Sequence, residues 1–178
     1  GRLFRNEGID SNHNPEFTTM ESYEAYADYN DVMEMVENLF AQIVFNVKGS
    51  YEIPYGENKL NFKPPWKRVN LRKSLIEKSG IDYEKCIELN VLKEKMSNIG
   101  IDVRNQLSWA GLMDKLISEK LEPDLIQPTF LIDYPLEMSP LAKRSKDNPN
   151  IVERFEGFIA GMEVCNAFTE LNDPVDQR

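Results

Sequence analysis

Charged and aromatic residues near the start of this sequence lie where a β-sheet normally places apolar ones. If residues 3–7 and 17–26 are strands, period-2 alternation puts polar or aromatic side chains on one face of each. These residues are Arg5 and Glu7 in the first segment, and Phe17, Glu21 and Tyr23 in the second. A half-buried sheet normally shows an apolar inner face, so this pattern indicates a site. A planar guanidinium such as that of Arg5 can donate in parallel to two oxygens, which suits phosphate and carboxylate groups.

Residues near the other end of the chain also form a polar strand face. Asn166, Phe168 and Glu170 are spaced by two, so a strand places them on the same side. Glu163 has the opposite parity. It can join that side only if a bulge or bend falls near Val164–Cys165.

Two segments resemble motif 2 of the class II aminoacyl-tRNA synthetases: Phe4–Glu7, with the letters FRNE, and Phe17–Glu21, with FTTME. In that motif, two strands and a loop bind ATP and the amino acid. The longer strings RNEG, HNPEFT and E-x-Y-x-A-Y-x-D-Y resemble the lysyl-tRNA synthetase branch. A second match, in Arg154–Glu156 and Gly161–Asp173, is similar to the metal and lysine-pocket strands of that branch. Two separate matches in the expected order make chance similarity a poor explanation.

The resemblance implies that four residues bind ATP. Arg5 would bridge the α-phosphate and the amino-acid carboxylate, and it is the catalytic candidate. Glu7 would orient the adenine end, and His13, the only histidine, would contact the outer phosphates. Phe17 would stack on adenine. The plain alternatives are an ion pair of Arg5 with Glu7 or Glu21, a solvated loop histidine and a core phenylalanine.

The resemblance also implies a lysine pocket. Asn166 would contact the amino-acid carboxylate, and Phe168 would pack along the lysine stem. Glu170 and Tyr23 would bind the ε-ammonium, and Glu21 would bind the α-ammonium. A desolvated Glu170 without its cation would cost about 3–5 kcal/mol, so an uncharged amino acid of the same length would be rejected. The alternative for Glu170 is an exposed acid on a strand.

Glu156 and Glu163 are the metal candidates by the same resemblance. A turn near residues 160–161 would let the two acids approach each other across a hairpin. Carboxylate oxygens suit Mg²⁺, which keeps several waters and binds through one or two carboxylates plus substrate phosphates. We therefore expect Mg²⁺ to bind together with ATP, and little or no metal without it.

The resemblance implies both a fold and an activity. The fold would be α+β, the class II synthetase catalytic fold: a mainly antiparallel sheet flanked by helices, with a helical insertion at about 81–121. The parent enzyme, a homodimer, would activate L-lysine with ATP and transfer it to tRNA(Lys). Residues 1–178 would be a partial catalytic domain, since motif 1, motif 3 and the anticodon-binding OB-fold have no counterpart here. We expect this piece alone to be inactive or nearly so.

Two alternatives remain open. One is a family relative that attaches lysine to a translation factor, which an upstream OB-fold would argue against and its absence would favour. The other is a non-catalytic interaction or regulatory module that keeps the synthetase fold without needing nucleotide. Aspartyl and asparaginyl relatives fit less well, because Glu170 and Tyr23 suit a cationic side chain.

The longest predicted helix covers residues 29–48. Its apolar residues recur every three or four positions, which predicts one buried face. These residues are Val32, Val36, Leu39, Ile43 and Val47. Asp28 or Asn30 would cap the start of the helix, and Gly49 would end it.

The remaining segments predict short elements. In chain order they are strands 51–54 and 59–62, a helix 71–78 capped by Asn70, helices 83–99 and 106–120, and strands 129–133, 152–159 and 163–171. The loop Ser139–Arg144 resembles one beside the family's active site. No chemistry is assigned to the helical segment.

Composition agrees with a one-domain globular protein. The 178 residues are 41% hydrophobic, with no run of about 18 apolar residues and no signal-peptide pattern. We expect Cys86 and Cys165 to be reduced, which favours the cytoplasm. The net charge of -9 opposes a nucleic acid backbone, so most tRNA contacts would lie on other parts of the enzyme. The acidic excess suits a cationic substrate.

Overall fold

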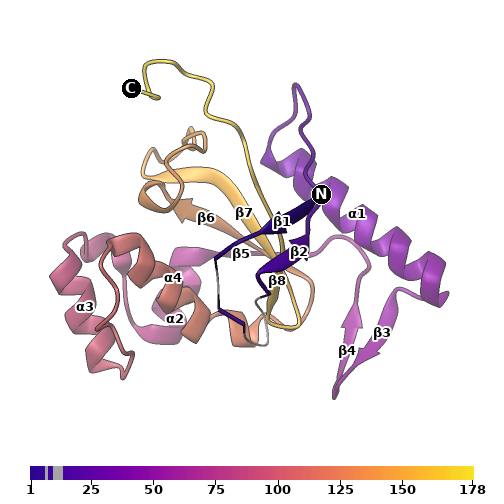
Figure 1. Ribbon diagram of the computed structural model, residues 1–178, viewed down its shortest axis with the longest axis horizontal. Helices are drawn as coiled ribbons and strands as arrows, with labels where there is room; N and C mark the ends of the chain where they lie inside the picture. Colours follow the sequence, from indigo (N-terminus) through magenta and orange to yellow (C-terminus); the bar gives the residue numbers. More distant parts are fainter. Residues whose placement is uncertain (7, 10–13) are drawn as a thin grey trace.

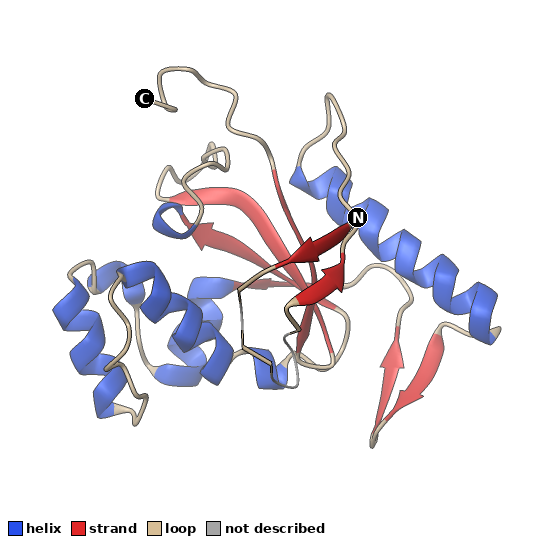
Figure 2. Cartoon of the chain, viewed as in Figure 1, coloured by secondary structure: helices blue, strands red, loops and turns tan. Residues whose placement is uncertain are grey.

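Helices cover both faces of a central β-sheet (Figure 1). The structure, a computed structural model, describes residues 1–6, 8, 9 and 14–178. Helix α1 (Tyr29–Lys48) packs on one face, and α2 (Leu71–Ser79), α3 (Leu89–Asn98) and α4 (Trp109–Lys120) lie toward the other. The cartoon in Figure 2 shows this separation, with a helix on one side and a group of helices on the other.

The central sheet has the strand order β5-β6-β7-β8. Its strands are β5 (Lys67–Asn70), β6 (Thr129–Pro135), β7 (Ile151–Ile159) and β8 (Met162–Phe168). β5 runs parallel to β6, and the other two pairings are antiparallel. A mainly antiparallel sheet flanked by helices confirms the predicted α+β fold. The predicted strands near the end of the chain are also confirmed, although β8 ends earlier than residue 171.

Alternate residues of β6 and β7 pack into two separate cores. Phe130 and Phe155 join α1 and Trp66 in one core. Leu131 and Phe158 join α2, α3 and α4 in the other. Because successive strand residues point to opposite faces, a sheet covered on both sides needs apolar residues of both parities.

Helix α1 has the predicted bounds and caps. Asp28 caps its start by accepting from the backbone N–H groups of Asn30 and Asp31, and Gly49 ends it at φ 69°. The predicted buried face is partly wrong. The buried residues of α1 are Met33, Val36, Glu37 and Ala41. The predicted stripe drifts around the helix, so Leu39, Ile43 and Val47 are 37–70% exposed.

The N-terminal hairpin is shorter than predicted. It consists of β1 (Arg2–Phe4) and β2 (Glu16–Thr18), paired antiparallel with Leu3 opposite Phe17. Arg5 therefore follows its strand, and residues 19–28 form no strand. Most side chains of that segment are exposed, and among the described residues no strand pairs with it. The prediction of a strand over 17–26 is thus wrong beyond residue 18.

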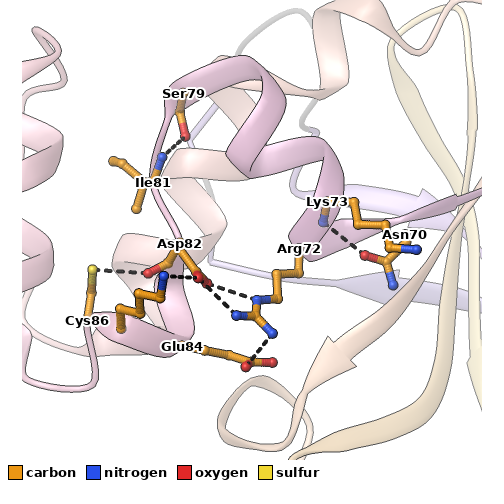
Figure 3. A network of polar contacts seen from close by, with 9 residues as sticks. Asn70, Arg72, Lys73, Ser79, Ile81, Asp82, Glu84 and Cys86 are labelled. Carbon is orange, nitrogen blue, oxygen red and sulfur yellow. Dashed lines mark hydrogen bonds and ion pairs between the residues drawn. The ribbon is translucent and has the colours of Figure 1, made fainter.

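The middle of the chain contains a hairpin and a capped helix, as predicted. β3 (Glu52–Tyr55) pairs with β4 (Asn58–Asn61), and Gly56 adopts φ 56° in the turn. The Asn70 side chain accepts from the Lys73 backbone N–H at 2.9 Å and caps α2. Figure 3 shows how α2 is held to the following turn. There Arg72 donates to Asp82 at 2.8 Å and pairs with Glu84.

The segment 81–121 is helical, but its helices are shorter than predicted. The first prediction, 83–99, divides into the short helix η1 (Tyr83–Lys85) and α3. Between them, the Cys86 carbonyl accepts from the Trp109 indole N–H at 2.8 Å, which holds that stretch outside a helix. The second helix begins later because Ser108 caps α4. The short helices η2 (Glu122–Asp124) and η3 (Leu136–Met138) flank β6.

Two observations bear on the environment of the chain. Cys86 and Cys165 are free cysteines, and burial raises the pKa of the Cys165 thiol to about 12. None of the helices in the described residues is both long and apolar enough to cross a membrane.

Candidate functional site

A cleft of about 950 Å³ opens between the N-terminal hairpin, α4 and the β7–β8 turn. Its lining comes from both ends of the sequence and from the segment between residues 106 and 122. Four of the predicted site residues lie in it: Arg5, Phe17, Glu156 and Glu163. The two segments that carry the motifs therefore meet at one hollow of the surface.

A smaller cavity of about 250 Å³ lies beside the start of α2 and contains none of the predicted site residues. Arg72 in its lining is already paired with acids (Figure 3). The hydroxyl of buried Tyr83 has no hydrogen-bond partner among the described residues, and burial raises its pKa. We place the candidate site in the larger cleft, where the charged motif residues gather.

Arg5 and Phe17 meet at the end of the N-terminal hairpin. The backbone N–H of Arg5 donates to the Pro15 carbonyl at 2.9 Å, so the hairpin continues one residue past β1. The guanidinium carbon of Arg5 lies 5.3 Å from the centre of the Phe17 ring. A cation over an aromatic face is attracted to it, and this contact orients the guanidinium on the cleft lining.

Glu156 is held by two neighbours. The Tyr134 hydroxyl donates to its Oε2 at 2.6 Å, and Arg154 Nη2 donates to its Oε1. Arg154 and Glu156 are two residues apart on β7 and share a face of the sheet. The guanidinium of Arg154 also lies over the Tyr134 ring, 4.7 Å from its centre. Burial and the Glu156 charge raise the pKa of Tyr134 well above its usual value, so it stays a donor.

A β-bulge brings Glu163 to the same face as Glu156. Gly157 pairs with Cys165 and Phe158 with Glu163, which leaves Val164 as an extra residue of β8. The bulge that Glu163 needs in order to join this face is therefore present near Val164–Cys165, and it reverses the parity of Glu163.

The surroundings of the Glu163 carboxyl disfavour its charged form. Desolvation in the cleft and the neighbouring Glu156 carboxylate raise its pKa to about 7, and a hydrogen bond from the Asn166 side chain opposes this rise. Positive charge placed between these two acids would relieve their repulsion.

The three lysine-pocket candidates on the last strand lie farther along the same face. Asn166 stands opposite Glu156, and Phe168 stands opposite Arg154 and packs against the core under α2–α4. Glu170 lies beyond β8, exposed, where it bridges to Ala142. None of the three lines the cleft.

Glu21 and Tyr23 are not placed as a strand would place them. Both are exposed, and neither lines the cleft. The segment that carries them ends beside the last strand, where the Tyr29 backbone N–H donates to Thr169 Oγ1 at 3.0 Å. This contact puts the start of α1 next to Glu170. The roles predicted for Glu7 and His13 fall on residues outside the described part of the chain.

Sequence reasoning missed the wall that α4 and η2 contribute to the cleft. Asp114, Lys115 and Glu122 line it, facing the two predicted metal acids. Burial and Glu156 raise the pKa of Asp114, and burial raises that of Glu122, with Glu156 adding to it. A signal was present: Gly111, Asp114, Ser118 and Glu122 recur at helical spacing as a polar face.

The residues present fit Mg²⁺ only together with a phosphate ligand. Among the described residues, no group of three or more His, Cys, Asp or Glu side chains is arranged to hold a metal ion. Glu156 and Glu163 supply two carboxylates on one face. Mg²⁺ commonly binds one or two carboxylates plus substrate phosphates, so this donor set suits a cation that arrives with a nucleotide.

Comparison with known proteins shows the family of the chain. Residues 1–178 match the family model described as tRNA synthetases class II (D, K and N), and the chain belongs to that family. It is 51% identical over 177 residues to a lysine–tRNA ligase of Chloroflexus aurantiacus and 48% identical over 178 residues to one of Dehalococcoides mccartyi. The match to a lysine–tRNA ligase of Clostridium tetani is 47% over 181 residues.

These matches cover nearly all of this chain but only part of each relative. They include 99–100% of this chain and 36% of each of the three ligases. The chain thus spans about a third of the length of the curated relatives it matches.

Proposed function

We propose that this chain is the central part of a catalytic domain that activates L-lysine with ATP and transfers it to tRNA(Lys). The observation that carries the proposal is the cleft, where Arg5 and Phe17 lie with Glu156 and Glu163. Similarity to lysine–tRNA ligases supports lysine as the amino acid. Because the chain matches about a third of those ligases, the activity is proposed for the whole protein.

Amino-acid activation joins a carboxylate to the α-phosphate of ATP and releases pyrophosphate. The carboxylate is already ionised at neutral pH, so no general base is needed. The protein must instead hold two anions together and neutralise the charge that develops on the leaving group. Arg5 suits this role, because its guanidinium can donate to an oxygen of each anion.

The nucleotide would lie along the N-terminal hairpin. One face of the Phe17 ring carries Arg5, and the other face is the one proposed to stack on adenine. We propose that Glu7 orients the adenine end and that His13 contacts the outer phosphates. A histidine there would gain or lose its charge near physiological pH.

Glu156 and Glu163 would hold Mg²⁺ together with the phosphates of ATP. When bound, the ion would neutralise negative charge on the phosphates. The contribution of the chain itself is to keep one carboxylate oriented by Tyr134 and Arg154 and a second close beside it.

The lysine side chain would lie toward Glu170. In this proposal Asn166 contacts the carboxylate of the substrate, Phe168 packs along its stem, and Glu170 with Tyr23 binds the ε-ammonium. Glu21 would bind the α-ammonium. The contact between the start of α1 and Thr169 supports this grouping, because it brings the end of the Glu21 segment beside Glu170.

The partners belong to the same proposal. The full-length enzyme would act in the cytoplasm as a homodimer on ATP, L-lysine and tRNA(Lys). With a net charge of -9, this part of the chain is poorly suited to a nucleic acid backbone, so other parts would make most tRNA contacts.

Exchange of labelled pyrophosphate into ATP by the full-length protein tests the proposal. We expect exchange that depends on lysine and not on aspartate, followed by transfer of lysine to tRNA(Lys). Transfer to a translation factor and not to tRNA would replace the proposed acceptor. A folded protein without any exchange would instead indicate a non-catalytic module.

Calorimetry on the 178-residue chain gives a second test. With ATP and lysine added together, we expect weak binding. A preference for aspartate over lysine would contradict the proposed substrate.

A further inference from the structure

We infer that Tyr134 and Arg154 are positioning residues that fix the Glu156 carboxylate for a cation in the cleft. This inference rests on the proposed function, in which Glu156 binds Mg²⁺ with ATP. It concerns two side chains to which neither the motifs nor the comparisons give a role.

The first step is the geometry around Glu156. Each of its two oxygens accepts one hydrogen bond from the protein, Oε2 from the Tyr134 hydroxyl and Oε1 from Arg154 Nη2. A carboxylate has about four lone-pair sites, so these two bonds set its orientation and leave acceptor capacity toward the cleft.

The second step is that Arg154 is itself held. Its Nη1 donates to Ser139 Oγ at 2.6 Å and to the Met138 carbonyl at 3.2 Å. Its guanidinium rests on the Tyr134 ring, and its side chain is only 14% exposed. The loop that begins at Ser139 is thereby joined to the carboxylate that lines the cleft.

The third step separates this role from simple core packing. Tyr134 and Tyr83 are both almost completely buried on the same side of the sheet. The Tyr83 hydroxyl has no partner in the described part of the chain, whereas the Tyr134 hydroxyl is directed at Glu156. Burial of a tyrosine in this core therefore does not require a hydrogen bond from its hydroxyl. The bond from Tyr134 to Glu156 is thus a specific feature of this tyrosine.

Groups that orient metal ligands generally affect metal affinity without touching the metal. Loss of such a partner costs roughly 10–100-fold in affinity or activity. Because both oxygens of Glu156 accept a hydrogen bond from the protein, we assign Glu156 as the member of the pair whose orientation is fixed before the cation binds.

The test compares two tyrosine-to-phenylalanine variants of the full-length protein. ATP binding is measured by calorimetry as the magnesium concentration is varied, with thermal unfolding as a check of folding. For Tyr134→Phe we expect the magnesium concentration at half-maximal ATP binding to rise about 10-fold. The matched control, Tyr83→Phe, should shift it less than about twofold.

Ser139→Ala provides a second variant in case Tyr134→Phe does not fold. It removes one support of Arg154 at a half-buried position and should raise the magnesium requirement in the same direction, by a smaller factor. A folded Tyr134→Phe protein with an unchanged magnesium requirement would overturn the inference, as would equal shifts in both tyrosine variants. If Tyr134→Phe does not fold, an unchanged magnesium requirement in Ser139→Ala would overturn the inference.

The same data separate this inference from the proposed function. A wild-type protein that binds no ATP at any magnesium concentration would overturn the proposed function and the inference together. Normal magnesium-dependent binding by the wild type, with no change in Tyr134→Phe, would overturn the positioning role alone.

Discussion

Two carboxylate–arginine pairs lie on opposite faces of the central sheet. On the α1 face, Glu37 accepts from the Trp66 backbone N–H at 2.7 Å and from Arg68 at 2.7 and 3.1 Å. On the other face, Glu156 accepts from Tyr134 and Arg154. In both pairs the guanidinium lies over an aromatic ring.

The two carboxylates differ in how much of their hydrogen-bonding capacity remains accessible to a ligand. Glu37 is 4% exposed and accepts three hydrogen bonds inside the protein. Glu156 accepts two and lines the cleft. The same chemical arrangement can therefore stabilise a core or present a ligand, depending on whether acceptor capacity remains toward solvent.

Removing the enclosed carboxylate should have the largest effect on stability. Glu37→Ala leaves Arg68 and the Trp66 N–H without their acceptor in a buried place, and we expect a loss of about 3 kcal/mol. Chemical denaturation measures it. Glu34→Ala, at an exposed position of the same helix, should change stability by less than about 0.5 kcal/mol. Equal losses in the two variants would contradict the stabilising role assigned to the enclosed carboxylate of Glu37.

The charged residues of the cleft should matter for activity more than for folding. We expect Arg5→Ala to slow lysine-dependent pyrophosphate exchange by about 10²–10³-fold in the full-length protein, because one donor to the developing charge is lost. Arg5→Lys should restore only part of the rate, since it lacks the planar fork. Thermal unfolding should barely change, and a large loss of stability with normal exchange would contradict the assignment.

A smaller effect is expected at Gly157, a position of β7 that faces α1. A Cβ on Gly157 would lie 2.5 Å from Cys165 Sγ and 3.3 Å from the Phe130 ring. Gly157→Ala should therefore cost about 1–3 kcal/mol by overpacking the α1 face. In a Cys165→Ala background the cost should shrink. An equal cost in both backgrounds would mean that the sulfur is not the obstacle.

The smallest effect is a pH dependence at Glu163. Its pKa of about 7 exceeds the ordinary 4.5, so between these values the native state holds a proton that the unfolded chain has released. Stability should fall as pH rises through this window. Glu163→Gln removes that loss, and after allowance for solvent exposure we expect a gain of about 1 kcal/mol above pH 7.

Denaturation at pH 4 and pH 7.5, with a chelator present, checks this prediction. The variant and the wild type should be equally stable at the lower pH and differ at the higher one. A Glu163→Gln protein that loses as much stability as the wild type between these two pH values would contradict the prediction.

Patterns confined to one element predicted much of the fold. Asp28 and Gly49 mark the ends of α1, and Asn70 marks the start of α2, because caps depend on a few adjacent residues. The sequence also shows that Glu163 needs a bulge to join the face of Asn166, since alternation along a strand is a local property, but only the structure shows that the bulge is there.

Features that depend on distant neighbours were harder to predict. Alternation in residues 17–26 favoured a strand, but a strand also needs a partner, and none pairs with that segment among the described residues. The cleft residues Asp114 and Glu122 gain their setting from Glu156, which lies on another element. Sequence spacing on α4 indicates a polar face but does not say which surface that face meets.

The extra residue Val164 shows that the length of β8 carries information separate from its composition. Its side chain is partly exposed and stands opposite no residue of β7, so many amino acids should serve there equally well. Without the bulge, strict alternation over the same residues would turn Glu163 to the reverse side of the sheet, although every letter of the motif remained. At this hairpin, the pairing register decides which face Glu163 occupies, and the identity of residue 164 matters less.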